Sequence, residues 1–172
     1  MGELHIASAF DRDLESIQAL VMRMGGMVEA AILDAAQALD TGDTDLAEKV
    51  RAGDKAIDAL EEKINEEAAR LIALRAPAAS DLRVVLSVMK IAASLERVGD
   101  YAKNIAKRAN VLGGLAQISG AGGSVRRMAR AVETMLRDAL DAYNGRRLDL
   151  AEDVRRRDQE IDQMYNALFR EF

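Results

Sequence analysis

The amino-acid sequence predicts an all-α protein built as tandem three-helix bundles, with the second bundle lacking its last helix. Three observations lead to this prediction. Hydrophobic residues make up 49% of the 172 residues and aromatic residues 3%, with a single proline, which is a composition typical of helical proteins. Apolar residues recur at helical spacing along most of the chain. A segment of the first half also returns in the second half, which indicates an internal duplication.

The first helix is predicted from one long apolar stripe whose members alternate steps of three and four residues, a spacing suited to a bundle or a coiled coil. The stripe consists of Phe10, Leu14, Ile17, Val21, Met24, Val28, Ala31, Ala35 and Leu39. Methionines surround the pair Gly25–Gly26 in this helix, and we expect an adaptable core with a close helix contact there. The turn sequence "DTGD" ends the helix at Gly42.

Four further helices follow. The second starts near Asp45, with Glu48 completing a capping box, and Pro77 breaks it. The third runs over about 80–111, the fourth spans about 124–143, and the fifth runs from the turn at Asn144–Gly145 to the end. The expected units are therefore a first three-helix repeat at 1–112, a Gly-rich linker at 113–123 and a partial second repeat of two helices at 124–172.

The internal repeat has an offset of 104 positions. The segment "DLAEKVRAGDKAID" (45–58) returns as "DLAEDVRRRDQEID" (149–162), with nine of the fourteen residues identical. The same offset pairs Asp34 with Asp138. Because the second copy contains only two predicted helices, we expect the apolar face of the fourth and fifth helices to pack against another chain or a displaced helix.

Two neighbouring helices carry like-charged pairs at four-residue spacing. Glu96 and Asp100 share one face of the third helix, where such a pair repels by roughly 0.2–0.5 kcal/mol. Gly99 beside them costs about 1 kcal/mol relative to alanine in a helix interior, and we expect it to let a neighbouring backbone or a ligand come close. The second helix carries a similar pair, Asp54 and Asp58.

Carboxylate oxygens are ligands for magnesium, calcium, manganese and iron, so the two helices predict a metal site where they meet. The duplication preserves the pair of the second helix in the fifth helix. The predicted ligands are Asp54, Asp58, Glu61, Glu96, Asp100, Asp158 and Asp162. A solvated acidic face explains the same pattern without a metal, since Arg97, Lys103 and Lys55 are near enough in sequence to pair with these carboxylates.

Several function classes are disfavoured. The chain contains no cysteine and a single histidine, His5, so it has neither thiolate ligands nor the Glu-x-x-His pattern of di-iron bundles. It has no P-loop, no Gly-x-Gly-x-x-Gly and no nucleophile–histidine pair, which argues against an enzyme. The net charge of −5 argues against nucleic-acid binding. Without a signal peptide or an uninterrupted apolar span of about 20 residues, we expect a cytoplasmic protein.

Four segments, taken in order, carry a family resemblance. They are "MGGMVEAAI" (24–32), "GDKAIDALE" (53–61), "APAASDLRVV" (76–85) and "KIAASLERVGDYAKNIAK" (90–107). Together they closely resemble the PhoU family of accessory regulators of bacterial phosphate-specific transport. The resemblance implies two similar three-helix bundles in a cytoplasmic, often dimeric protein that is not an enzyme.

The resemblance also implies a role and partners. Such proteins are negative regulators of phosphate uptake and of the phosphate-starvation response. The implied partners are the ATPase subunit of the phosphate ABC transporter and a sensor histidine kinase, and contact with the membrane is made only through them. Two alternatives stay open, which are a structural helical adaptor without a metal or phosphate role and a metal-dependent enzyme in a bundle scaffold.

The family's E(D)-x-x-x-D motifs, which are associated with metal sites, map onto Asp54–Asp58 and Glu96–Asp100. Asp158–Asp162 would form half of a second site. The resemblance therefore implies a cation on these carboxylates, of iron, manganese, zinc or magnesium. The family pattern also includes a second E-R-x-G-D segment in a sixth helix, which this sequence does not contain.

Overall fold

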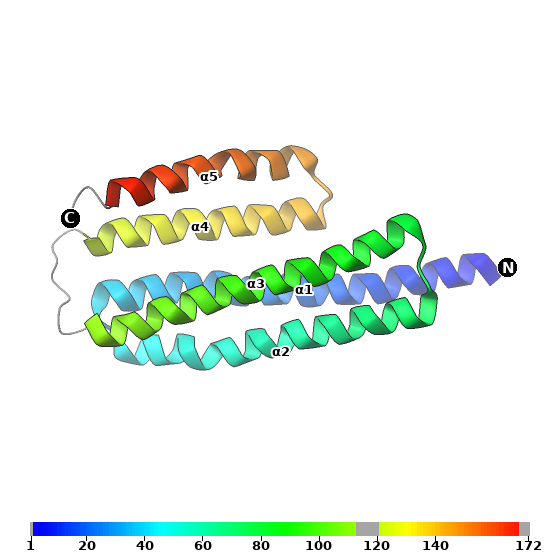
Figure 1. Ribbon diagram of the computed structural model, residues 1–172, viewed down its shortest axis with the longest axis horizontal. Helices are drawn as coiled ribbons and strands as arrows, with labels where there is room; N and C mark the ends of the chain where they lie inside the picture. The colour runs from blue at the N-terminus through cyan, green and yellow to red at the C-terminus, as the bar shows by residue number, and fades with distance from the viewer. Residues whose placement is uncertain (1, 113–120, 169–172) are drawn as a thin grey trace.

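The computed structural model of the chain describes residues 2–112 and 121–168 and places almost all of them in five helices. In chain order these are α1 (Gly2–Thr41), α2 (Thr44–Arg75), α3 (Ala79–Leu112), α4 (Ala121–Asn144) and α5 (Leu148–Leu168). Figure 1 shows them as long rods lying side by side. The all-α prediction is therefore confirmed.

Most helix ends lie within a few residues of their predicted positions. The largest differences are at α1, which begins well before the first residue of the predicted stripe, and at α4, which begins at Ala121 instead of near Ser124. Residues 113–120 of the predicted linker and 169–172 of the predicted fifth helix lie outside the described residues.

The first three helices pack against one another in pairs and form a three-helix bundle (Figure 1). The core runs along the bundle, and its largest fully buried side chains are Met24, Ile64, Val21, Val28, Val85 and Val88. Burying each such side chain contributes about 1.5–3 kcal/mol. The apolar stripe predicted for the first helix is therefore the side that faces this core.

α1 holds the central position, because it contacts α2, α3 and α4. Its segment Ala9–Thr41 is long and apolar enough to cross a membrane by length and composition, and it is the one such helix in the described part of the chain. It is not an uninterrupted apolar stretch, because Arg23 and Glu29 lie within it. A helix that packs against three neighbours needs apolar residues on several faces, which accounts for part of this composition, because 28% of the apolar window is buried.

The turn between α1 and α2 corrects one prediction. The N-cap of α2 is Asp43, not Asp45, and its Oδ1 accepts a hydrogen bond from the backbone N–H of Leu46 at 2.9 Å. Gly42 has a φ of 68°, the left-handed conformation that glycine adopts at little cost. Asp43 therefore caps the helix two residues earlier than the capping-box pattern indicates, and Asp45 lies in the first turn of the helix.

α4 lies antiparallel on α1, and α5 returns along α4 (Figure 1). Two ion pairs show that α1 and α4 run in opposite directions. Glu29 pairs with Arg137 at 3.3 Å, and Asp40, further along α1, pairs with Arg126, earlier in α4, at 3.0 Å. The second repeat is therefore attached to the first through its own first helix.

The internal repeat is visible in the helix ends and in the side-chain contacts. α2 begins at residue 44 and α5 at residue 148, which are 104 positions apart. The equivalent carboxylates each form an ion pair with a basic residue of the helix that follows. Asp34 pairs with Lys49, and Asp138 pairs with Arg157. Each helical hairpin is thus joined by an ion pair at the same carboxylate of the repeat, although Lys49 and Arg157 are not equivalent positions.

The two hairpins differ in burial. Leu60 of α2 is 7% exposed beside α3, whereas Met164, at the equivalent position of α5, is 37% exposed. The difference follows from the packing, because the one described helix that α5 contacts is α4. The expectation that this face packs against another chain or a displaced helix stays a prediction.

The expected close helix contact at Gly25 is confirmed, and it lies between α1 and α4. The effect of filling this contact can be predicted. A Cβ atom at Gly25 would lie 2.2 Å from Leu140 Cδ1 of α4, whereas one at Gly26 would meet nothing within 4 Å. We expect Gly25→Val to lower the free energy of unfolding by about 1–3 kcal/mol through overpacking. The matched control Gly26→Val should change it by less than about 0.5 kcal/mol. Urea unfolding measures both, and equal losses would contradict the assigned α1–α4 contact.

Candidate functional site

Five of the seven predicted metal ligands lie where α2 packs against α3, and we call these five the acidic seam. Asp54, Asp58 and Glu61 come from successive turns of α2, and Glu96 and Asp100 come from α3. Asp54 is buried, at 3% exposed, while Asp58 is exposed and the other three are partly exposed. The convergence of carboxylates from two helices agrees with the prediction, and whether they bind a metal stays a prediction.

Lys103 of α3 places its ammonium group inside the acidic seam. Its Nζ forms an ion pair with Asp54 of α2 and a second with Asp100 of α3, the latter at 3.1 Å. The two ion pairs raise the pKa of Lys103, with the hydrogen bond to Asp54 contributing most. One side chain therefore joins the E-x-x-x-D pair of α3 to the D-x-x-x-D pair of α2.

The sequence identified Lys103 only as one of three cations able to pair with a carboxylate. The spacing of three residues from Asp100 favours the ion pair within α3. No sequence signal pointed to the pair with Asp54, because that contact depends on how α2 and α3 are aligned.

The carboxylates of the seam repel one another, and this repulsion contributes to the raised pKa values of Glu96 and Asp58. Partial loss of hydration, followed by the charge of Asp100, raises the pKa of Glu96, and the charges of Glu61 and Asp58 add to the effect. The pKa of Asp58 is also raised, first by partial loss of hydration and then by the charge of Asp54. The charge of Lys103 opposes this shift. A single ammonium group thus leaves part of the repulsion in the seam uncompensated.

The donor atoms of the seam suit a hard divalent cation, because carboxylate oxygens are its preferred ligands. Asp54 Oδ1 is buried and has no hydrogen-bond partner within the described structure, and a nearby cation would satisfy it. As the side chains stand, no group of three or more Asp, Glu, His or Cys among the residues described is arranged to hold an ion. The seam thus suits a cation in the chemistry and charge of its donor atoms but not in their present arrangement, in which the Lys103 ammonium contacts both Asp54 and Asp100.

Gly99 corrects an interpretation made from the sequence. The close approach at Gly99 is made by a side chain of α2 and not by a neighbouring backbone, and the approach of a ligand stays a prediction. A Cβ at position 99 would lie 3.2 and 3.3 Å from two carbon atoms of Ile57, but 3.9 Å from Asp54 Oδ1, which is ordinary van der Waals contact. Gly99 therefore lets α2 pack closely on α3, and it affects the carboxylates only through that packing.

The two predicted ligands of the second repeat are not brought to the seam. Asp158 and Asp162 are exposed on α5, and the neighbour of α5 in the described chain is α4. Their equivalents, Asp54 and Asp58, face α3, whose carboxylates complete the seam. The half-site predicted for the second repeat remains a pair of carboxylates on one helix.

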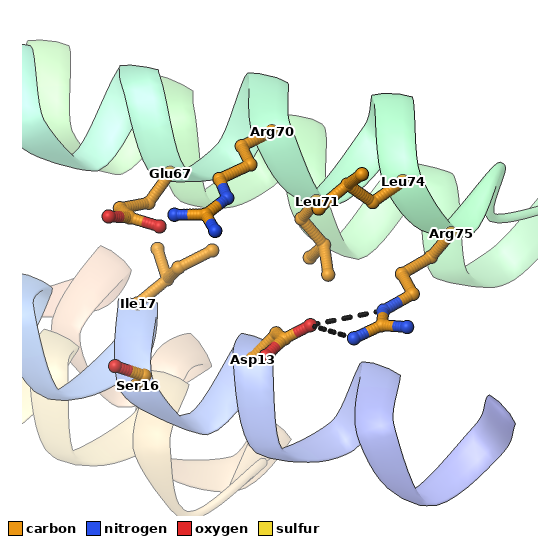
Figure 2. Close-up of a pocket in the computed structure, with 8 residues that line it drawn as sticks. All are labelled: Asp13, Ser16, Ile17, Glu67, Arg70, Leu71, Leu74 and Arg75. Atoms are coloured by element: carbon orange, nitrogen blue, oxygen red, sulfur yellow. Dashed lines mark hydrogen bonds and ion pairs between the residues drawn. The ribbon is translucent and has the colours of Figure 1, made fainter. Parts of the chain in front are cut away.

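A second polar site lies between α1 and α2, in a cavity of about 190 Å³. Figure 2 shows Arg75 donating from Nε and Nη2 to Asp13 Oδ2, at 3.1 and 3.0 Å. Glu67 and Arg70 also line the cavity. Two acidic and two basic side chains balance in charge, so this cavity offers no excess positive charge for a phosphate anion.

Comparison with known proteins shows close relatives. A family model described as "PhoU domain" matches residues 21–109 and 125–172. A Caulobacter vibrioides protein named "Phosphate-specific transport system accessory protein PhoU homolog" is 44% identical over 167 residues, which cover 97% of this chain and 73% of the relative.

Solved structures agree with this result. The crystal structure of PhoU from Pseudomonas aeruginosa matches with a TM-score of 0.89 and 38% identity, over 94% of this chain and 78% of that one. The phosphate transport system regulatory protein PhoU from Streptococcus pneumoniae matches with a TM-score of 0.84 and 33% identity, over 92% of this chain and 74% of that one.

The raised pKa of Glu96 predicts an effect of pH on stability. The folded protein binds a proton at Glu96 more readily than the unfolded chain does, so this group opposes folding at pH 7 and does so less as pH falls. We expect Glu96→Gln, without metal, to raise the free energy of unfolding at pH 7 by roughly 0.2–0.5 kcal/mol. The gain should shrink as pH falls through the pKa of Glu96. Urea unfolding from pH 7 to 4.5 measures this, and a variant less stable than the wild type at pH 7 would contradict it.

The ion pair of Lys103 predicts a larger effect. Lys103→Met leaves the buried carboxylate of Asp54 without its cation, and we expect a loss of about 1–3 kcal/mol in the free energy of unfolding. The matched control is Lys107→Met, an exposed position one turn further along α3. Urea unfolding in the presence of EDTA measures both variants. Equal stability of the two would show that the pair with Asp54 contributes nothing.

Proposed function

The chain belongs to the PhoU family, and we propose that it is an accessory protein of a phosphate-specific transport system. The observation that carries this proposal is the 44% identity to a protein of that name over 97% of the chain. The similarity extends over nearly the whole chain, so it supports a shared role beyond a shared fold.

Within that role we propose negative regulation of phosphate uptake and of the phosphate-starvation response. The chain would bind the ATPase subunit of the phosphate ABC transporter and a sensor histidine kinase in the cytoplasm, and would do so as a homodimer. The Streptococcus pneumoniae relative, named as a regulatory protein, supports regulation. The long exposed helical surfaces suit binding to proteins.

The acidic seam would serve as the metal site of this regulator. Its five carboxylates, Asp54, Asp58, Glu61, Glu96 and Asp100, would hold a divalent cation such as iron, manganese, zinc or magnesium. A bound cation would supply the positive charge that relieves the repulsion raising the pKa of Asp58 and Glu96. We propose a binding role for this cation and no catalytic one, because the sequence offers no nucleophile–histidine pair beside it.

A helical adaptor without metal is the second candidate, and one observation favours it. Lys103 already pairs with Asp54 and Asp100, so part of the charge of the seam is compensated by the chain itself. The two candidates differ in what they predict for variants of the seam.

The proposed regulation predicts a phenotype. Deleting the encoding gene should activate a phosphate-starvation promoter in cells grown with ample phosphate, and the wild-type chain should restore repression. Glu96→Gln with Asp100→Asn should fail to restore it, whereas Lys107→Met should succeed. A promoter reporter gives the readout, and affinity capture of the chain should recover the transporter ATPase and a sensor kinase.

Two results would count against this account. A promoter unaffected by the deletion, with neither partner captured, would contradict the regulatory role. Full repression by the doubly substituted chain would favour the adaptor without metal.

A further inference from the structure

Lys103 occupies the position where a cation would join the two motifs of the acidic seam. Its Nζ contacts Asp54 of α2 and, at 3.1 Å, Asp100 of α3. These are one carboxylate from each like-charged pair. An ion shared by α2 and α3 would bind the same two carboxylates, so the ammonium group and the ion compete for one place.

The surrounding charges explain why a cation belongs there. Asp54 is 3% exposed, and a carboxylate so far removed from water is destabilising unless a cation accompanies it. Its Oδ2 faces Lys103, but its Oδ1 has no hydrogen-bond partner in the part of the chain that the structure describes. The ammonium thus pairs with one oxygen of the buried carboxylate and leaves the charge of the other without a hydrogen-bond partner among the described residues.

Taking the proposed metal site as a premise, we infer that Lys103 is a tethered counter-cation, which fills the acidic seam in the metal-free protein and leaves it when a divalent cation binds. Its side chain is 41% exposed, and four flexible methylene groups carry the ammonium. It can therefore rotate into solvent without moving α3.

Charge makes simultaneous occupancy unfavourable. The Lys103 ammonium contacts the carboxylates of both Asp54 and Asp100, and divalent cations bind carboxylate oxygens at about 2.0–2.6 Å. An ion on the same two carboxylates would therefore lie close to the ammonium, and the two positive charges would repel at that range. Lys103 consequently lowers the metal affinity of the seam and keeps α2 and α3 joined when the metal is absent.

The test is calorimetric titration of the full chain with Mn²⁺, after removal of metal with EDTA. Lys103→Met removes the competing charge and keeps most of the side chain, Lys103→Arg keeps the charge, and Lys107→Met is the matched control on the same helix. We expect Lys103→Met to bind Mn²⁺ at least about tenfold more tightly than the wild type, which corresponds to about 1.4 kcal/mol. The Arg variant and the control should stay near the wild-type affinity.

The outcomes separate this inference from the metal site itself. Glu96→Gln with Asp100→Asn should abolish binding in either background, which tests the site. If the wild type binds Mn²⁺ and Lys103→Met binds it equally or more weakly, Lys103 is not a competitor although the site is real. If no variant binds Mn²⁺, the metal site and this inference are both wrong.

A measurement on the wild-type chain covers the case in which Lys103→Met does not fold. The side-chain ¹⁵Nζ resonance of Lys103 reports its ion pairs and can be followed while diamagnetic Mg²⁺ or Zn²⁺ is added. We expect it to move to the position of a free lysine as the ion binds, with the resonance of Lys107 unchanged. A Lys103 resonance that stays in place at saturating metal would overturn the inference.

Discussion

The contact between α2 and α3 is the constraint on which the acidic seam depends. Ile57 packs against Gly99, and this close approach removes the neighbouring Asp54 from water. A carboxylate in that position requires a cation, and Lys103 of α3 provides one. The packing of Ile57 on Gly99 and the pairing of Asp54 with Lys103 thus depend on the same contact between the two helices. The same alignment of α2 and α3 brings the other carboxylates of the seam together.

The duplication gives an internal comparison for this constraint. α2 and α5 carry nearly the same acidic sequence, yet Asp54 is buried and Asp158 is exposed. The difference comes from the third helix, because α3 covers α2 and supplies Glu96, Asp100 and Lys103. An E(D)-x-x-x-D motif on one helix is therefore only a pair of surface carboxylates, and a second helix turns it into a candidate site.

Much of this arrangement could be predicted from the sequence, because helical periodicity is a local property that packing reinforces. The long stripe from Phe10 to Leu39, the break at Pro77 and the 104-residue repeat predicted the five helices, and four-residue spacing predicted that carboxylates of two helices converge. The pair between Lys103 and Asp54 could not be predicted in this way. It depends on the rotation and alignment of α3 against α2, which arise from the fit of many side chains.

We propose that the acidic seam holds either the Lys103 ammonium or a divalent cation. Crystals of the chain grown once with EDTA and once with Mn²⁺, measured at a wavelength where manganese scatters anomalously, test it most directly. We expect an anomalous peak beside Asp54 and Asp100 in the second crystal only, with the Lys103 side chain turned toward solvent. The same Lys103 ion pairs in both crystals, without an anomalous peak between the helices, would contradict it.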